Sequence, residues 1–240
     1  MLILSLIEKW FMRYVQTTRS EVENMSCILC QENAVAHYHK DRKRCYLHCG
    51  NCDLVFVPNT FHLTALEEKK VYDQHQNNAL DVGYRTFLSR LVNPLLLMLP
   101  EHSKGLDFGS GPGPTLSLMM SEAGHKMQIY DPFYAPHRSV LSDCYDFITA
   151  TEVVEHLSDP SRVLELLWSI LKPGGILGIM TKLVVSQEAF EKWHYKNDPT
   201  HISFYSKKSF DYIARRWRTT AEIVGKDVIL LRKPPKQRML

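Results

Sequence analysis

Residues 104–113, Lys-Gly-Leu-Asp-Phe-Gly-Ser-Gly-Pro-Gly, run a short apolar stretch directly into a glycine-rich loop. Residues 114–123 follow with a proline near their first turn, so the sequence predicts a strand, a loop and a helix in succession. Glycines let the backbone pass close to a ligand and leave amide groups available to bind it. We therefore expect this loop to bind a cofactor.

A carboxylate follows the next predicted strand. Residues 127–130 end at Asp131, eighteen residues after Gly113, where a carboxylate can accept both hydroxyls of a ribose. The glycines do not fit the dinucleotide fingerprint G-x-G-x-x-G, because in neither frame is the last position a glycine. Asp107 would repel a pyrophosphate and attract a cationic amino-acid ligand. The pattern thus disfavours a dinucleotide.

The arrangement D-x-G-x-G-x-G followed by an acidic residue resembles motif I and the second-strand end of class I S-adenosylmethionine-dependent methyltransferases. The resemblance covers roughly residues 80 to 233. It implies that the ligand's ammonium lies near Asp107 and its ribose on Asp131. The other residues that it implies at the cofactor are Gly109, Ser110, Gly111, Gly113 and Thr151.

The rest of the chain predicts an α/β fold. Strands are expected over 145–150 and 176–182, helices over 161–171 and 206–217, and a hairpin over 220–231 around Gly225-Lys226. Only about a dozen residues separate Asp131 from the strand at 145, so a third strand and its helix must be abbreviated. We predict a Rossmann-like class I methyltransferase sheet with a C-terminal antiparallel hairpin, plus a small N-terminal zinc ribbon.

Four cysteines predict the ribbon. Cys27 and Cys30, then Cys49 and Cys52, form two C-x2-C pairs eighteen residues apart, a spacing typical of structural four-thiolate zinc sites. Strand-like stretches at 34–39, 44–48 and 54–57 suit a three-stranded ribbon. The alternative is a small core of reduced cysteines. We expect structural Zn²⁺ with no catalytic role.

Residues 151–157, Thr-Glu-Val-Val-Glu-His-Leu, carry the candidate chemistry. On a helix Glu152, Glu155 and His156 would share one face beside the cofactor, with His156 as the base that takes a proton from the acceptor. Alternatively Glu152 only caps this turn and His156 packs the cleft wall. E-x-x-E-H also resembles a motif of small-RNA 2′-O-methyltransferases and of demethylubiquinol O-methyltransferases. The resemblance to the former implies a second divalent metal site, completed here by His201 and suited to Mg, Mn or Zn.

Charge and composition limit the kinds of partner that the protein is expected to bind. Of 240 residues 45% are hydrophobic and 23% charged, which is ordinary globular usage, and the net charge of +3 does not indicate a globally basic surface. The basic loop at residues 40–44 could track a nucleic acid, but an exposed loop tip is favoured. The chain has no apolar run long enough to cross a bilayer and no secretory signal, so we expect a cytoplasmic protein.

Four regions are expected: a helical extension at 1–24 or an upstream start before Met25, the zinc ribbon at 25–60, a helical linker or lid at 61–104, and the cofactor domain at 105–240. The predicted activity is transfer of a methyl group from S-adenosylmethionine to a hydroxyl or nitrogen of a small molecule. Methylation of RNA through the ribbon is the first alternative, and binding of S-adenosylmethionine without catalysis is the second.

Overall fold

The computed structural model describes residues 25–74 and 78–236, so the extension expected at 1–24 lies outside the described residues. The α-helices are α3 (Ala65–Tyr72), α4 (Val82–Leu96), α5 (Thr115–Glu122), α6 (Pro160–Ile170), α7 (Gln187–Glu191) and α8 (Lys207–Arg216). The strands are β1 (Val35–Lys40), β2 (Cys45–Cys49), β3 (Val55–Phe56), β4 (Lys104–Phe108), β5 (Lys126–Tyr130), β6 (Tyr145–Thr151), β7 (Leu171–Met180), β8 (Ser203–Phe204), β9 (Ala221–Val224) and β10 (Val228–Arg232). Short 3-10 helices cover Asn59–Phe61, Arg138–Ser142, Val154–His156 and His194–Asn197.

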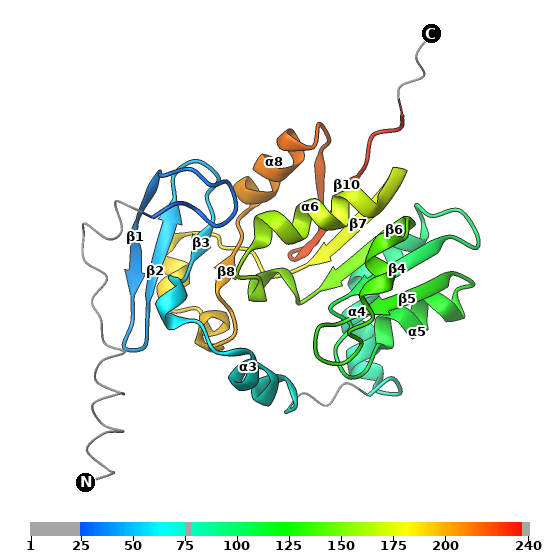
Figure 1. The fold of residues 1–240 in the computed structure, drawn as a ribbon, viewed down its shortest axis with the longest axis horizontal. Helices are drawn as coiled ribbons and strands as arrows, with labels where there is room; N and C mark the ends of the chain where they lie inside the picture. The colour runs from blue at the N-terminus through cyan, green and yellow to red at the C-terminus, as the bar shows by residue number, and fades with distance from the viewer. Residues whose placement is uncertain (1–24, 75–77, 237–240) are drawn as a thin grey trace.

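The larger sheet has the strand order β5-β4-β6-β7-β10-β9 (Figure 1). Strands β5, β4, β6 and β7 are parallel, whereas β10 is antiparallel to both β7 and β9. This confirms the predicted Rossmann-like sheet and its C-terminal hairpin. Between β5 and β6 the chain forms one 3-10 helix, Arg138–Ser142, and no strand of the sheet, so the third strand, which was predicted to be abbreviated, is missing altogether.

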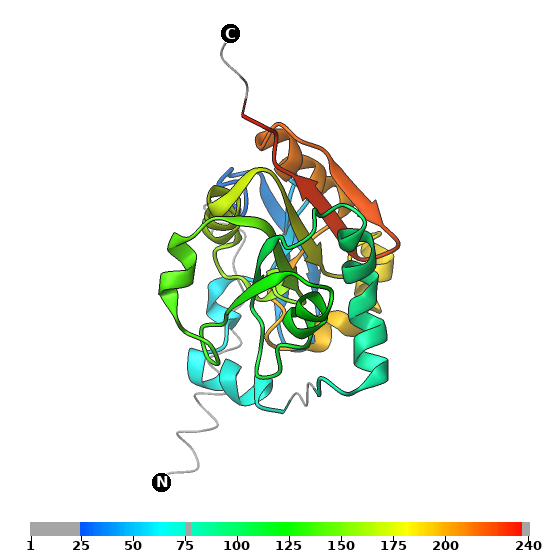
Figure 2. The same ribbon diagram turned by 90° about the vertical axis from the view of Figure 1, so that its right-hand side faces the viewer.

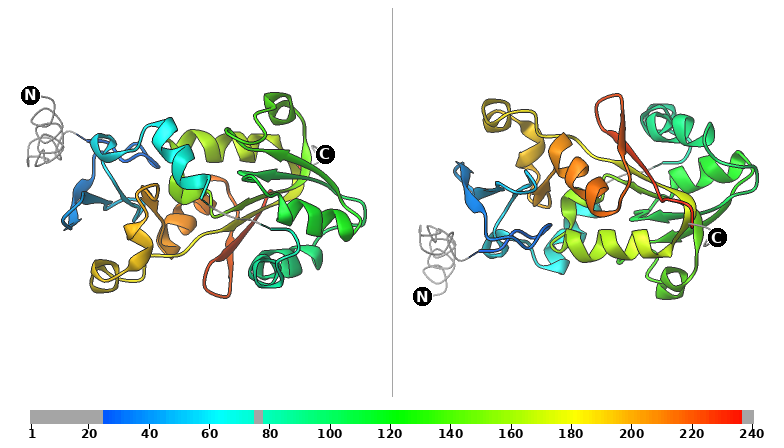
Figure 3. Two further views of the ribbon diagram at one scale, coloured as in Figure 1. Left: turned by 90° about the horizontal axis from the view of Figure 1, so that it is seen from below. Right: turned by 90° about the horizontal axis from the view of Figure 1, so that it is seen from above.

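Helices cover both faces of this sheet (Figures 2 and 3). Apolar side chains of α6 and α8 share one buried cluster with β4, β6 and β7. Side chains of α4 and α5 form a second cluster with β7 and β10, in which Leu91 of α4 approaches Gly178. The inner strands β4, β6 and β7 are largely buried, as expected for a doubly covered sheet, whereas the edge strand β5 is only partly buried.

The ribbon differs from its predicted form in having a fourth strand. The smaller sheet has the order β1-β2-β3-β8, in which β8 comes from the C-terminal half of the chain (Figure 1). Val55 pairs with Phe204 and Phe56 with Ser203. Short-range sequence patterns cannot reveal this pairing, which covers an otherwise open edge of β3. The ribbon also shares its buried core with β4 and β6, so it is built into the larger unit.

Candidate active site

A cleft of about 760 Å³ opens where β4, β5 and β6 end, which is where open α/β sheets bind ligands. Its volume lies within the range of about 300 to 1,000 Å³ typical of ligand pockets. Helices α3 and α4 contribute Glu68, Tyr72, Tyr84 and Phe87 to its wall. The other lining residues used below are Gly109, Ser110, Gly111, Asp131, Pro132, Phe133, Tyr134, Thr151, Glu152, Val153, His156, Asp198 and His201.

The glycine loop forms one wall of the cleft. Gly109 and Gly111 have φ angles of 75° and 62°, which L side chains rarely adopt. A Cβ on Gly109 would lie 2.4 Å from a methyl carbon of Val153, so the loop packs against the segment after β6. The Gly109 amide donates to the Tyr130 carbonyl at 2.7 Å. Gly113, also predicted at the cofactor, does not line the cleft.

Asp131, which was predicted to bind a ribose, directly follows β5 and lines the cleft. One oxygen accepts a hydrogen bond from the Gly111 amide at 3.0 Å. The other accepts from the amides of Phe133 and Tyr134 at 2.8 and 3.0 Å. These bonds fix the carboxylate at the cleft wall, and its remaining lone pairs can accept hydrogen bonds from hydroxyl groups.

Asp107 lies beneath the loop and not in the cleft, which differs from the predicted contact with an ammonium group. Its carboxylate accepts a hydrogen bond from Thr149 Oγ1 at 2.9 Å and is buried. Burial raises the pKa of Asp107 to about 6, although hydrogen bonds from Thr149 and the Ser117 amide oppose this. Asp107 therefore supports the loop from within.

Three buried polar atoms at the cleft have no hydrogen-bond partner among the described residues: Ser110 Oγ, Thr151 Oγ1 and Glu152 Oε1. Buried polar groups in native proteins are normally satisfied, so such atoms fit a polar ligand. Together with Asp131 and the two left-handed glycines they fit a ligand that carries a ribose and an amino-acid group. Burial, followed by the charge of Glu155, raises the pKa of Glu152 to about 8.

The sequence pattern did not identify the aromatic side chains after β5 as part of the site. Phe133 and Tyr134 line the cleft next to Asp131, together with Pro132. Their spacing from Asp131 was visible, but nothing in the sequence showed that a bridge between Asp131 and Ala135 would turn them into the cleft. The two rings are inclined by 66° to each other, so each offers a separate aromatic surface against which a planar ring could pack.

The predicted helix at Glu152, Glu155 and His156 is wrong. Glu152 has a φ angle of 53° and its amide donates to the Met180 carbonyl at 2.8 Å, so β7 holds it outside any helix. Only Val154–His156 forms a single 3-10 turn, which also excludes the expected helix cap at Glu152. The left-handed backbone at a non-glycine residue is sparsely populated and is common at functional sites.

Glu155 points away from the cleft into a buried network. Its carboxylate accepts hydrogen bonds from Tyr195 Oη at 2.5 Å and Thr181 Oγ1 at 3.0 Å. Burial raises its pKa, while the charge of His201 and the two hydroxyl groups oppose that shift. Tyr195 lies in the connection between β7 and β8, and its hydroxyl holds the Glu155 carboxylate.

Two histidines meet beside this carboxylate. His201 Nδ1 donates to the Tyr195 carbonyl at 2.7 Å, and His156 Nδ1 donates to the Thr200 carbonyl at 3.2 Å. A carbonyl can only accept, so the proton of each neutral ring lies on Nδ1 and the lone pair on Nε2. Burial lowers the pKa of His201, which favours its neutral form.

Glu155, His156 and His201 each offer one ligand atom, and these atoms lie within 4.8 Å of one another. The two histidine rings are 4.7 Å apart between centroids. Glu152, predicted as a fourth ligand, is not in this group. The structure therefore brings together three members of the expected set around one point.

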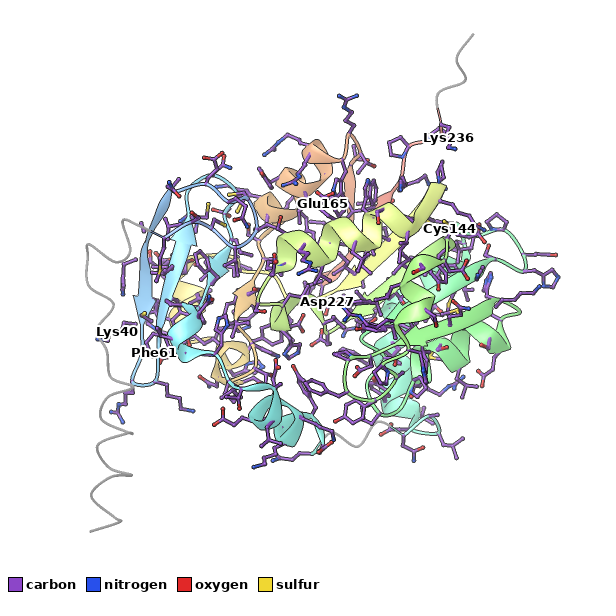
Figure 4. The ribbon with its side chains drawn as sticks, viewed as in Figure 1. Lys40, Phe61, Cys144, Glu165, Asp227 and Lys236 are labelled. Carbon is purple, nitrogen blue, oxygen red and sulfur yellow. The ribbon has the colours of Figure 1, made fainter. Side chains whose placement is uncertain are left out.

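The four cysteines of the ribbon converge as the spacing predicted. Cys27, Cys30, Cys49 and Cys52 are buried, and their sulfurs lie within 4.8 Å of one another. Two of the separations are 3.4 and 3.5 Å. A tetrahedron built from zinc–sulfur bonds of 2.3 Å has sulfurs about 3.8 Å apart, so the cluster fits a zinc ion. Cys144 lies at the far end of the molecule from the ribbon (Figure 4).

The basic loop of the ribbon is not a uniformly exposed tip. Lys40, Arg42 and Lys43 are exposed, but Arg44 is buried and its guanidinium bonds to backbone carbonyls of residues 196–199. Arg44 is therefore unavailable to a nucleic acid. Long-range contacts of this kind leave no signal in a short charge pattern.

A family model described as a methyltransferase domain matches residues 80–216. The ubiquinone biosynthesis O-methyltransferase of Aeromonas salmonicida is 34% identical over 80 residues, which are 33% of this chain and 34% of that protein. The tRNA 5-carboxymethoxyuridine methyltransferase of Escherichia coli is 32% identical over 109 residues, with 35% of this chain and 41% of that protein covered. The chain thus spans less than half the length of these curated relatives.

Among solved structures, a Burkholderia thailandensis 1,6-didemethyltoxoflavin-N1-methyltransferase with bound 1,6-didemethyltoxoflavin and S-adenosylhomocysteine is similar, with a TM-score of 0.48 and 14% identity. The match covers 82% of this chain and 99% of that chain. Within residues 25–74 and 78–236 no helix is both long and apolar enough to span a bilayer.

Proposed function

Because the chain belongs to the methyltransferase-domain family, we propose that it transfers a methyl group from S-adenosylmethionine to a small aromatic acceptor, at a hydroxyl in preference to a nitrogen. The observation that carries this proposal is the pair of histidines with unprotonated Nε2 atoms at the wall of a cleft that begins at the glycine loop. A hydroxyl must lose its proton when it accepts a methyl group, and a neutral histidine can take it.

The cofactor would lie along the glycine loop. Gly109, Ser110 and Gly111 would contact its amino-acid part and Asp131 its ribose, while Phe133 would contact the adenine. When bound, S-adenosylmethionine supplies an electrophilic methyl group. The chain's contribution is to orient the acceptor beside it and to exclude water, and positioning of this kind accounts for a large part of the rate in bimolecular reactions.

The lining of the cleft supports a small uncharged acceptor over RNA. No lysine or arginine of the described part of the chain lines it, whereas the carboxyl side chains Glu68, Asp131, Glu152 and Asp198 do. A phosphate backbone requires cationic side chains for affinity. Burial raises the pKa of Glu68, and it raises that of Glu152 to about 8, so Glu152 is largely neutral at pH 7. Aromatic side chains of α3 and α4 suit a planar acceptor.

Glu155, His156 and His201 would hold a divalent cation, for which two imidazoles and a carboxylate favour Mn²⁺ or Zn²⁺ over Mg²⁺. With their Nε2 lone pairs bound to a cation the histidines could not also accept the proton, and the cation would instead lower the pKa of the acceptor hydroxyl. The four cysteines would hold a separate structural Zn²⁺. In this proposal His156 and His201 are the catalytic residues, and Glu152 adjoins the cofactor.

Tritiated methyl transfer from S-adenosylmethionine into fractionated cell extract tests the proposal, with RNA, protein and small molecules separated afterwards. Label in the small-molecule fraction, lost in H201A and retained in the exposed-site control K43A, is the expected result. Label in the RNA fraction would indicate an RNA acceptor, as for the tRNA methyltransferase relative. Cofactor binding without label in any fraction would indicate a protein that binds S-adenosylmethionine without catalysis. Either outcome overturns the proposed acceptor.

The second metal is tested by exhaustive chelation, with zinc content and thermal unfolding of the ribbon followed in parallel. We expect turnover to fall while the ribbon's tighter zinc remains bound, and added Mn²⁺ to restore it. Unchanged turnover after removal of all weakly bound metal would leave the histidines as bases only.

A further inference from the structure

Arg44 of the ribbon uses its whole guanidinium to hold one loop near the cleft. Its Nη2 donates to the carbonyls of Lys196 and Asp198 at 2.5 and 2.7 Å, and its Nη1 donates to the Pro199 carbonyl at 3.1 Å. Its Nε donates to Tyr46 Oη at 3.0 Å. The side chain comes from the turn before β2, more than 150 residues from the loop that it binds.

A half-buried carboxylate, that of Asp41, completes this contact. Asp41 accepts hydrogen bonds from Tyr46 Oη at 2.9 Å and from the ammonium of Lys196 at 3.1 Å. Although burial opposes it, the amides of Lys43 and Arg44, followed by these two side chains, lower the pKa of Asp41 to about 2. Asp41 thus stays ionised and ties the same turn of the ribbon to residue 196.

The loop held in this way carries the groups that orient both histidines. The Tyr195 carbonyl accepts from His201 Nδ1, and the Thr200 carbonyl accepts from His156 Nδ1. Arg44 binds the carbonyls of residues 196, 198 and 199, which lie between these two acceptors. Fixing those three peptides therefore fixes the direction of the carbonyls on either side.

From this geometry we propose that Arg44 is a positioning residue, which sets the tautomer and orientation of His156 and His201 from the ribbon side. The inference rests on the proposed function only for its effect on methyl transfer, since the tautomers can be observed without catalysis. It assigns the ribbon a role in shaping the active site, and it explains why an arginine is buried there.

Lysine cannot replace arginine in this role. The guanidinium forms a planar fork that reaches three carbonyls and a hydroxyl at once, whereas an ammonium is a point charge with a different reach. R44K keeps the positive charge beside Asp41 and loses the fork. Because Lys43 lies on the same turn and is exposed, K43A is the matched control.

The first measurement is nitrogen NMR of histidine side chains in the metal-free protein, with H156Q and H201Q used for assignment. In the native protein and K43A we expect both rings as the Nδ1-protonated tautomer. In R44K we expect a mixture of tautomers, while zinc content and the melting transition show that the ribbon is folded. Unchanged tautomers in a folded R44K would overturn the proposal.

The second measurement is steady-state methyl transfer. A displacement of about 1 Å at a catalytic group costs on the order of 100-fold in rate. We expect R44K to lose about that factor in kcat, with S-adenosylmethionine affinity unchanged because the cofactor loop does not contact Arg44. Addition of guanidinium to R44A should recover part of the loss. If native protein transfers no methyl group, the proposed function fails but the NMR result still decides the role of Arg44.

Discussion

Replacement of Asp107 by asparagine should stabilise the protein at neutral pH. Asp107 is fully enclosed beneath the glycine loop, and burial raises its pKa to about 6 from an ordinary value of 3.8. Between these two pH values the unfolded chain has released the proton and the folded chain still binds it, so stability falls as pH rises. Two pKa units correspond to about 3 kcal/mol, and this loss is complete above about pH 6.

D107N carries no such penalty, and its side-chain oxygen can still accept from Thr149. The difference in free energy of unfolding between D107N and the native protein should therefore grow by about 2 kcal/mol between pH 4.5 and 7.5. Urea unfolding of both proteins at several pH values measures it. D143N is the control, because Asp143 is only half-buried and hydrogen bonds from Lys104 and the Cys144 amide lower its pKa. A difference that does not change with pH would refute the buried ionisation.

Three further predictions concern the loop and the ribbon. D131A should weaken S-adenosylmethionine binding by about 10- to 100-fold in calorimetry, because hydrogen bonds to a charged group contribute about 1.5 to 3 kcal/mol; equal affinity would exclude a ribose contact. G109A should lower the melting temperature and weaken cofactor binding. The double variant G109A/V153A should regain part of the melting temperature and of the affinity, because Val153 occupies the space of the new Cβ. If neither is regained, the destabilisation comes from the left-handed backbone of residue 109 alone. C49S should reduce bound zinc from one equivalent, measured by mass spectrometry, and loosen the ribbon; full zinc content would contradict a four-thiolate site.

Local patterns predicted much of the fold. The strand and glycine loop at 104–113, the closing hairpin and the two cysteine pairs each lie within a short stretch whose backbone requirements are visible in the residues. The β8 strand could not be found in this way, because two residues carry no periodicity. Its pairing depends on the edge that β3 presents.

The sequence predicted which residues belong to the candidate site better than it predicted how they are arranged. His156 and His201 do meet, but Glu152 and Glu155 diverge because the Glu152 amide bonds to Met180 in β7 and prevents a helix. A spacing of i, i+3 and i+4 implies one face only if a helix forms. The burial of Arg44 likewise results from a contact between distant segments.

The pairing of β3 with β8 makes completion of the ribbon a late event in synthesis. Asp53, which follows the last cysteine of the ribbon, also accepts a hydrogen bond from Ser206 at 2.6 Å, across 153 residues of chain. Contacts with such separation raise the contact order and slow folding. During translation the four cysteines are available early and can bind zinc. The edge of β3 nevertheless stays unpaired until residue 204 has left the ribosome. During that interval the nascent ribbon is exposed to edge-to-edge association, so C-terminal truncation should increase aggregation.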